Sequence, residues 1–391
     1  MTKGFKAAGI AAGIKKNGGK DLGILYCEKP AVVAGVFTKN RVKAACVLLD
    51  QARLVSSGTC RAIIVNSGNA NCCNGESGMI DAVAMGKAAA DLLQIDEDQV
   101  MVASTGVIGQ RLPIEKVQNA APELVESLSQ EGFADLAESI MTTDTIPKVV
   151  TRKGEIDGTG YTVTGIAKGA GMIRPDMATM LCFVVTDVGI GREDLQEIVI
   201  AANDKSFNCI TIDGDTSTND TLLVMANGMS GAVAEKPEQV EGVSKVLEDV
   251  LIALAKMIVK DGEGATKLVE ISVINASSNI DARKIADTVA NSNLVKTAFF
   301  GEDANWGRII AAMGRSGVDF TYERIDLYFD DIRLVENGAY VGPDAEAAAS
   351  RVLKQPEFKV MIDMKTGAGA ANVWTCDFSI DYVKINADYR S

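Results

Sequence analysis

Histidine is absent from the 391 residues of this chain. Its absence excludes Ser-His-Asp and Cys-His catalysis and any metal site built on imidazole. Acid–base chemistry near neutral pH must therefore come from a carboxylate, a lysine, a thiol or a free α-amine. Positive charge is also in the minority, with 39 Lys and Arg against 52 Asp and Glu and a net charge of −13. Nucleic-acid binding needs clustered positive charge, so this balance argues against a nucleic-acid partner.

Several other signals are missing. None of the eight cysteines forms a C-x-x-C pair, which argues against zinc, iron–sulfur and thioredoxin-like sites. A chain of this length can build its core without disulfides, so we expect reduced thiols and a cytoplasmic protein. No apolar run approaches the length of a membrane span. The apolar stretch 7–14 is short and interrupted by glycine, and no clear cleavage site follows it, so it does not resemble a secretion signal.

Nucleotide-binding motifs are missing as well. The sequence contains no G-x-x-x-x-G-K-[ST], and no G-x-G-x-x-G opens a helix after a strand, which argues against a nucleotide cofactor. The segment 213–220 (DGDTSTND) resembles half of a calcium loop, but its glycine and its distal glutamate are misplaced. We interpret it as a turn held by Asx and Ser/Thr hydrogen bonds, and we expect no metal.

The pattern of hydrophobic residues favours an α+β fold. Glycines, 37 in all, separate short apolar runs, and helices and strands do not alternate strictly. The apolar, β-branched run 180–186 predicts a strand that is buried on both faces. Pro122 is expected to split or kink a helix over 114–129. Further strands are predicted at 32–37, 61–66 and 268–275, and further helices at 77–94, 133–141, 192–203, 243–259, 281–290 and 344–354.

Three segments could contribute to a site. Asn66–Asn71 places three asparagines directly after a strand, which suits either a loop cap or a polar pocket wall. Thr105-Gly106 follows an apolar strand, and such a step can direct a hydroxyl and a backbone N–H at one point, as an oxyanion hole requires. A simple glycine turn is the alternative for that step. The third segment, 168–181 (KGAGMIRPDMATML), runs from a lysine through glycines to Ala178-Thr179 at the start of the buried strand.

Thr179 offers a way to do nucleophilic chemistry without histidine. A threonine hydroxyl is a poor nucleophile and needs an adjacent base. If the Ala178–Thr179 bond is cut, Thr179 gains a free α-amine with a reference pKa of about 8. This amine can act as the base for the hydroxyl of the same residue. A nearby ammonium such as Lys168 would lower the pKa of that amine further. Because Ala-Thr before a strand is common, this motif alone leaves self-cleavage and an ordinary turn both open.

The stretch 168–181 resembles the self-cleavage signature of the ornithine acetyltransferase family of arginine biosynthesis, also called glutamate N-acetyltransferase. Three positions differ from the usual family residues: Asp176 stands in place of Asn, Cys72 in place of Ala and Asn74 in place of Thr. None of them is a position to which we assign chemistry. The matching motifs spread over the whole chain: 4–14, 66–71, 104–109, 141–145, 213–220, 261–267, 301–307 and 386–391.

The resemblance implies a fold, a reaction and a set of site residues. The fold would be a layered αββα sandwich of mixed sheets with a second, smaller α+β lobe, as in self-cleaving N-terminal-nucleophile proteins. The chain would cut itself into an α chain 1–178 and a β chain 179–391, which fold together as one unit and assemble as an α2β2 heterotetramer. Thr179 would take the acetyl group from N2-acetylornithine and pass it to glutamate. No cofactor is implied, and acetyl-CoA as a further acetyl donor is left open.

The resemblance also assigns individual residues. Thr105 and Gly106 match the oxyanion-hole pair, and Ala178 and Thr179 flank the cleaved bond. Lys168 would pair with the substrate carboxylate, and Glu263 with the δ-ammonium of acetylornithine. The matching substrate-binding positions are Thr142, Lys168, Thr179, Glu263, Asn386 and Ser391.

Two other functions remain as alternatives. A related self-cleaving aminopeptidase or amidohydrolase would use the same threonine and oxyanion hole but would discharge the acyl-enzyme with water. A non-catalytic binding or scaffold protein of the same fold would neither cleave itself nor turn over substrate. Incubation with acetylornithine, with and without glutamate, separates the first two.

Overall fold

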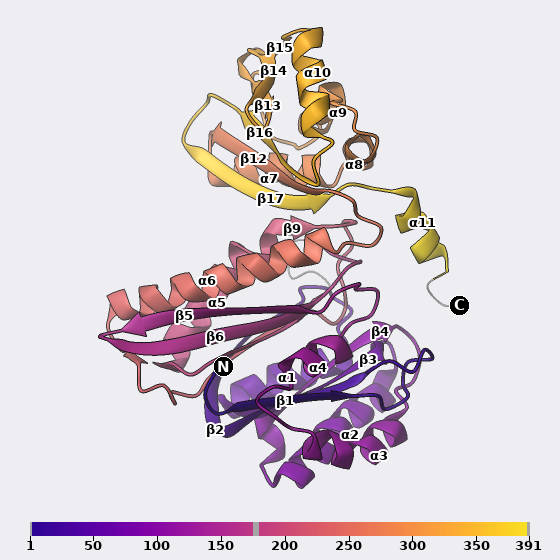
Figure 1. Cartoon of the computed structure of the whole chain (residues 1–391), viewed down its shortest axis with the longest axis vertical. Coiled ribbons are helices and arrows are strands. Elements are labelled where there is room, and N and C mark those ends of the chain that lie inside the picture. Colours follow the sequence, from indigo (N-terminus) through magenta and orange to yellow (C-terminus); the bar gives the residue numbers. More distant parts are fainter. Residues whose placement is uncertain (1, 175–179, 389–391) are drawn as a thin grey trace. The chain divides into compact units, whose positions relative to one another are not determined.

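A computed structural model describes residues 2–174 and 180–388 (Figure 1). Four residues named above, Asp176, Ala178, Thr179 and Ser391, lie outside the described residues. The chain divides into two compact units, each of which is described by itself. Unit 1 comprises Met1–Asn208 and Asp215–Ile258, and unit 2 comprises Cys209–Gly214 and Val259–Ser391.

Unit 1 is built on one eight-stranded sheet in the order β4-β3-β2-β10-β7-β6-β5, with β1 also paired to β2. The 16-residue strand β2 pairs with β3 through its first part and with β10 through its last part, and its register shifts between Tyr26 and Ala31. The strands are β1 Phe5–Ile10, β2 Leu22–Phe37, β3 Thr59–Asn69, β4 Val100–Val107, β5 Lys148–Ile156, β6 Thr159–Lys168, β7 Leu181–Thr186 and β10 Thr221–Ala226; β8 Gly189–Ile190 and β11 Val233–Ala234 form a separate pair.

The sheet of unit 1 bends so that its two halves face each other. A single buried cluster takes side chains from β1 to β4 and also from β6, β7 and β10, including Ile63, Phe183 and Leu223. Side chains of the opposite face of β1 to β4, among them Ile24 and Ile64, pack in a second cluster with α1, α2 and α3. The helices of unit 1 are α1 Ala45–Ser56, α2 Gly75–Leu93, α3 Ile114–Glu126, α4 Phe133–Ser139, α5 Arg192–Asp204 and α6 Pro237–Lys260.

Helices cover the second half of the sheet as well. Val250 and Leu254 of α6 lie 2.8 Å from where a side chain on Gly165 of β6 would begin, so β6 needs a glycine under that helix. In Figure 1, α6 lies outside β5 and β6, whereas α2 and α3 lie outside the layer of β1 to β4. This arrangement of helix, strand, strand and helix confirms the α+β sandwich expected from the family resemblance.

Unit 2 is a smaller α+β unit. Its seven-stranded mixed sheet has the order β15-β14-β13-β16-β12-β17-β9. One buried cluster joins the sheet to α7, α9 and α10, with Phe299 of α8 packed edge-on against Phe358 of β16. The elements are β9 Ile210–Thr211, β12 Leu268–Ala276, α7 Asn279–Ala290, α8 Asn293–Phe300, α9 Trp306–Gly314, β13 Asp326–Phe329, β14 Ile332–Glu336, β15 Ala339–Tyr340, α10 Pro343–Val352, β16 Glu357–Asp363, β17 Gly369–Cys376 and α11 Ile380–Ala387.

Most of the predicted elements are confirmed, and two differ in an informative way. Every residue of β7 is buried, as expected for a strand between two layers. Pro122 does not split its helix, because α3 continues from Ile114 to Glu126 through it. The strand predicted at 32–37 is the end of the much longer β2.

The predicted cleavage point falls between two neighbouring strands of unit 1. Lys168 at the end of β6 pairs with Leu181 at the start of β7, in an antiparallel arrangement. The predicted pieces 1–178 and 179–391 therefore contribute adjacent strands to one sheet, while cleavage itself stays a prediction. Among the helices of the described residues, none is long and apolar enough to cross a membrane.

Candidate active site

The predicted oxyanion pair lies at the carboxyl end of β4. Thr105 is 5% exposed, and Gly106 has a φ of +134°, which side-chain-bearing residues rarely adopt. A side-chain carbon on Gly106 would lie 2.3 Å from the carbonyl carbon of Gly68 in β3, so only glycine fits there. The register of β3 and β4 shifts at Gly68 and Asn69, which turns this end of β4 away from regular pairing.

Lys168 connects two predicted site residues that are far apart in the sequence. Its ammonium donates to the hydroxyl of Thr142 at 2.9 Å and to the hydroxyl of Thr105 at 3.3 Å. Lys168 is 3% exposed and ends β6, so its position is set by the sheet. The structure thus brings together a predicted oxyanion residue and two predicted substrate-binding residues within unit 1.

The residue that follows the predicted nucleophile is anchored by a buried carboxyl group. The N–H of Met180 donates to Oδ1 of Asp220 at 3.1 Å, and the N–H of Thr221 donates to the carbonyl of Met180 at 3.1 Å. Burial raises the pKa of Asp220 well above its usual range, and its Oδ2 has no hydrogen-bond partner among the described residues. These contacts fix Met180, which follows Thr179 in the sequence and directly precedes β7.

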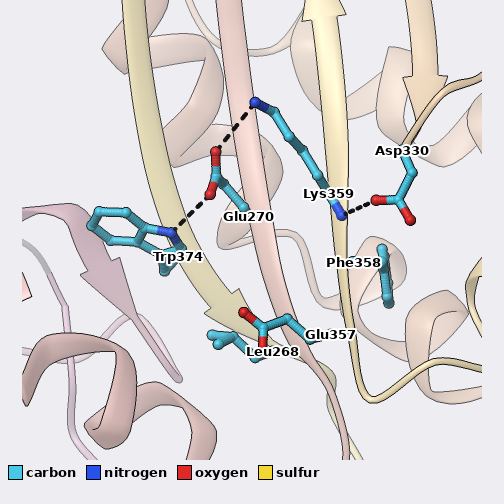
Figure 2. Close-up of a pocket in the computed structure, with 7 residues that line it drawn as sticks. All are labelled: Leu268, Glu270, Asp330, Glu357, Phe358, Lys359 and Trp374. Atoms are coloured by element: carbon cyan, nitrogen blue, oxygen red, sulfur yellow. Dashed lines mark hydrogen bonds and ion pairs between the residues drawn. The ribbon is translucent and has the colours of Figure 1, made fainter. Parts of the chain in front are cut away.

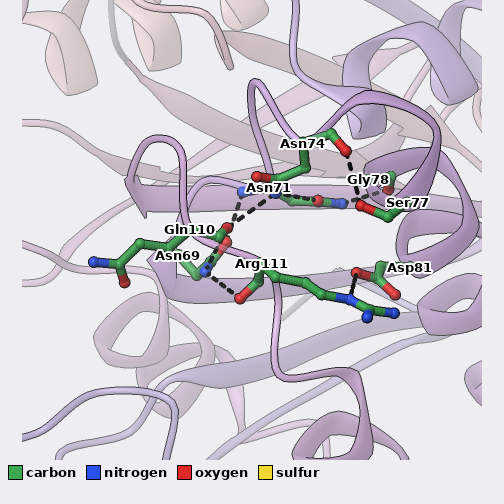
Figure 3. Close-up of polar contacts among 8 residues, drawn as sticks. All are labelled: Asn69, Asn71, Asn74, Ser77, Gly78, Asp81, Gln110 and Arg111. Atoms are coloured by element: carbon green, nitrogen blue, oxygen red, sulfur yellow. Dashed lines mark hydrogen bonds and ion pairs between the residues drawn. The ribbon is translucent and has the colours of Figure 1, made fainter.

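The asparagine-rich segment 66–71 is a loop cap. Figure 3 shows Asn69 donating to the carbonyls of Gln110 and Arg111, both at 3.1 Å, and Asn71 donating to the carbonyl of Gly78 at 2.8 Å. Asn74, where the family usually has threonine, bonds Asn71 and Gln110 in the same loop. Of the two interpretations left open by the sequence, the structure supports the cap, because the NH2 groups of Asn69 and Asn71 donate to backbone carbonyls of the surrounding loops.

The segment 213–220 also uses its side chains to hold backbone. Asn219 donates to the carbonyls of Ala70, at 2.6 Å, and Ser104, at 2.8 Å, which ties it to the strand that carries Thr105. Thr38 donates to the carbonyl of Ser217 at 2.7 Å. The turn interpretation is therefore supported, and no group of three His, Cys, Asp or Glu able to hold a metal occurs in the described part of the chain.

In unit 2, the structure joins two predicted substrate-binding residues that are 123 positions apart. Nδ2 of Asn386 in α11 donates to Oε2 of Glu263 at 2.6 Å. Glu263 is 8% exposed, and the next residue, Gly264, has a φ of +67°. A side chain on Gly264 would lie 2.6 Å from the backbone nitrogen of Tyr382 in α11. The Gly-Glu-Gly turn therefore allows the last helix to approach closely.

A surface pocket of about 230 Å³ lies on the sheet of unit 2 (Figure 2). Its polar groups bond one another: Glu270 accepts from the indole N–H of Trp374 at 3.1 Å and pairs with Lys359 at 3.3 Å. None of the predicted site residues lines it. The lining residues are Leu268, Glu270, Asp330, Glu357, Phe358, Lys359 and Trp374.

Two further charged residues near the site were not singled out from the sequence. Burial lowers the pKa of Lys15; the charge of Asp21 opposes this effect, and the charge of Lys168 lowers the pKa further. Asp144 accepts from the N–H of Thr142 and from the N–H of Gly169, the residue after Lys168. Asp144 lies within the motif 141–145 that matches the family and Lys15 directly follows the motif 4–14, but only the folded chain shows what the two residues contact.

Comparison with known proteins adds to this geometry. The sequence profile of the ArgJ family matches residues 6–391. "Arginine biosynthesis bifunctional protein ArgJ" of Geobacter sulfurreducens is 53% identical over 391 residues, covering 100% of this chain and 99% of the relative. The protein of the same name from Caldanaerobacter subterraneus subsp. tengcongensis is 50% identical over 397 residues, covering 100% of this chain and 98% of the relative.

Among solved structures, the ornithine acetyltransferase of Mycobacterium tuberculosis complexed with ornithine is 40% identical in sequence. The match covers 46% of this chain and 94% of the Mycobacterium tuberculosis chain, with a TM-score of 0.42.

Proposed function

The chain belongs to the ArgJ family, and from this premise we propose that it transfers the acetyl group of N2-acetylornithine to glutamate through an acetyl ester on Thr179. It is an acetyltransferase of arginine biosynthesis. The observation that carries the proposal is the family match over residues 6–391, together with relatives about half identical over their full length. The absence of histidine agrees with a threonine that uses its own α-amine as the base.

The reaction consists of two acyl transfers. The hydroxyl oxygen of Thr179 attacks the acetyl carbonyl of N2-acetylornithine, and its proton passes to the α-amine of the same residue. The resulting ammonium gives this proton to the departing nitrogen as the C–N bond breaks, which releases ornithine. The amine of glutamate then attacks the ester carbonyl, which gives N-acetylglutamate and restores the hydroxyl. The hydroxyl of Thr105 and the N–H of Gly106 would stabilise the oxyanion in both steps.

Substrate recognition follows from charge. Lys168, with Thr142 as its hydrogen-bond partner, would hold the substrate carboxylate. Glu263 would accept the δ-ammonium of acetylornithine, and Asn386 would orient that carboxylate through the 2.6 Å bond between them. Ser391 is assigned to the same function by the family resemblance alone.

The nucleophile would be exposed by self-cleavage. The Thr179 hydroxyl attacks the carbonyl carbon of Ala178, an ester replaces the peptide bond, and water then hydrolyses the ester. The products are chains 1–178 and 179–391. We further propose that the protein assembles as an α2β2 heterotetramer in the cytoplasm and has no resident cofactor. We also propose acetyl-CoA as a second acetyl donor, which the word "bifunctional" in the name of the relatives supports.

Acetyl transfer is tested by incubating purified protein with N2-acetylornithine, with and without glutamate. We expect ornithine to form steadily only when glutamate is present, with parallel double-reciprocal plots and an acetylated peptide that begins at Thr179. Steady release of acetate and ornithine without glutamate would identify a hydrolase instead. A parallel assay with [14C]acetyl-CoA and glutamate decides whether acetyl-CoA is a donor.

Self-cleavage is tested by intact mass spectrometry. Wild-type protein should give the two chains that meet at Ala178 and Thr179, whereas Thr179→Ala should remain one inactive chain, because alanine has no hydroxyl. A Thr179→Ala protein that still splits at the same bond would refute the mechanism.

A further inference from the structure

Asp144 is a buried carboxylate in the loop between α4 and β5, to which no role has been assigned so far. Its Oδ1 accepts from the ammonium of Lys148 at 2.8 Å and from the N–H of Gly169 at 2.7 Å. Its Oδ2 accepts from the N–H of Thr142 at 3.0 Å. The side chains of Asp144 and Lys148 are both fully buried. One carboxylate thus joins the loop, the first residue of β5 and the residue that follows β6.

Two of these contacts hold the backbone of predicted substrate-binding residues. Thr142 is bonded directly, and Gly169 is the residue after Lys168. The side chains of Thr142 and Lys168 are in turn bonded to each other at 2.9 Å. Asp144 therefore fixes the backbone at both ends of this side-chain hydrogen bond, which can form only if the loop and the end of β6 keep their spacing.

The charges of this cluster agree with such a role. Burial alone would raise the pKa of Asp144, but the charges of Lys168 and Lys148 and the hydrogen bonds of Lys148 and Thr142 lower it to about 2. The carboxylate is therefore ionised at neutral pH and balances one of the two ammonium groups. An ionised Asp144 can accept all three of its hydrogen bonds, from Lys148, Gly169 and Thr142.

We propose that Asp144 is a positioning residue for substrate recognition, which sets the spacing of Thr142 and Lys168 so that they meet the carboxylate of the amino-acid substrate. This inference rests on the proposed acetyltransferase function. The simpler alternative is that Asp144 and Lys148 form a buried ion pair that serves folding alone, since removing one partner of such a pair is strongly destabilising.

Three variants separate the two roles. Asp144→Asn loses the carboxylate; one amide oxygen remains, but an NH2 group cannot accept from the N–H of Thr142. Lys148→Met removes the charge pair but keeps the acceptor for Thr142 and Gly169. The double variant Asp144→Asn/Lys148→Met removes both charges and therefore leaves no unpaired buried ion. It allows the measurement even if Asp144→Asn alone fails to fold.

The matched control is Asp187→Asn. Asp187 is 2% exposed in the same unit and likewise accepts two backbone N–H bonds, from Lys3 at 3.0 Å and from Thr162 at 2.7 Å. Its bonds involve none of the predicted site residues. It therefore reports the effect of losing a buried carboxylate acceptor on stability, without the proposed effect on recognition.

The readouts are kcat and KM for acetylornithine, the extent of self-cleavage, and the urea midpoint of unfolding. We expect Asp144→Asn and the double variant to raise KM by about 10-fold or more, as for loss of one hydrogen bond to a charged group, while kcat changes by less than about 3-fold. The double variant should unfold at a higher urea concentration than Asp144→Asn. Asp187→Asn should lower the urea midpoint and leave KM within about 2-fold of wild type.

A mutant cycle with Lys168→Met tests whether Asp144 acts through Lys168. If it does, adding Asp144→Asn to Lys168→Met should raise KM by less than about 2-fold further, because the group that Asp144 positions is already gone. Independent, multiplying effects would overturn the proposal. A folded Asp144→Asn/Lys148→Met variant whose KM equals that of the wild type would overturn the proposal as well.

The activity of the wild-type protein is measured first, because it separates a failure of the proposed function from a failure of the proposed role of Asp144. A wild-type protein that does not transfer acetyl to glutamate refutes the proposed function. An active wild type whose Asp144 variants keep their KM refutes only the role of Asp144.

Discussion

The predicted site residues of unit 1 and of unit 2 are held in different ways. In unit 1, Thr105 and Lys168 are 5% and 3% exposed and sit at the ends of strands inside a two-layered sheet. In unit 2, Asn386 is exposed on α11, an eight-residue helix with no buried residue. Its side-chain contact to Glu263 is therefore carried by a short terminal element. Strand ends set geometry rigidly, whereas a short terminal helix frays easily.

This difference assigns separate tasks to the two regions. Changes at Thr105 and Gly106 in unit 1 should affect the rate of acyl transfer, whereas changes at Asp144 in the same unit should affect substrate recognition and the stability of the sheet together. Changes at α11 should affect substrate affinity and leave self-cleavage intact, because that chemistry is local to the Ala178–Thr179 bond. The following predictions, in decreasing order of expected effect, would break or sharpen this comparison.

The largest effect is expected for Gly106→Ala. The new side-chain carbon would lie 2.3 Å from a backbone carbon of Gly68, at a φ of +134°, so the N–H of the predicted oxyanion hole must move. We expect a loss of about 100-fold or more in kcat, comparable to loss of one oxyanion donor. Steady-state kinetics of the cleaved enzyme measures it.

Gly109→Ala is the control for that prediction. Gly109 also has a positive φ, of +80°, but its side-chain carbon would meet nothing within 4 Å. It should therefore lose some stability from backbone strain and keep kcat within about 3-fold. Equal losses of kcat in the two variants would show that close backbone approach at Gly106 is not what matters.

The second effect concerns acid stability in unit 1. The pKa of Asp144 is about 2 in the folded chain, against an ordinary value of 3.8, so the folded state favours the ionised form. This stabilisation is complete above the ordinary pKa and is lost as the pH falls from about 4 toward 2. By linkage it is on the order of 2 kcal/mol.

Urea unfolding at several pH values measures the stabilisation that ionised Asp144 contributes. The difference in free energy of unfolding between wild type and Asp144→Asn should be constant from pH 7 to pH 5 and should narrow as the pH falls below about 4, because asparagine does not titrate. A difference that widens on acidification would contradict the sign of the shift.

The smallest effect is expected at the end of unit 2. Deleting residues 386–391 should raise KM for acetylornithine about 10-fold, through loss of the hydrogen bond that orients Glu263, and should leave the extent of self-cleavage unchanged. Lys384→Ala is the control, because this exposed residue of the same helix forms its ion pair with nearby Asp381 and not with a predicted site residue among the described residues. An unchanged KM after deletion would remove Asn386 and Ser391 from the predicted site.

Much of the fold followed from local patterns. The apolar, β-branched run that ends at Thr186 predicted a strand buried on both faces, and periodic apolar residues predicted α2 and α5 within two residues at each end. Pro122 did not split its helix, because a proline weakens a helix locally but tertiary packing decides whether the helix continues. Leu124, two residues beyond it, is fully buried, so α3 gains more from packing than it loses.

The same distinction between local sequence patterns and tertiary structure applies to the candidate site. The sequence by itself determined the composition of the chemistry: no histidine, a threonine after alanine at the start of a buried strand, and a Thr-Gly step after another strand. Tertiary structure alone decided that Lys168 meets Thr142 and Thr105, that Asn386 meets Glu263, and that Asp144 lies behind the first pair. These contacts join residues between 25 and 123 positions apart. Local propensity extends over only a few residues, whereas such pairings depend on how the strands of each unit are ordered in its sheet.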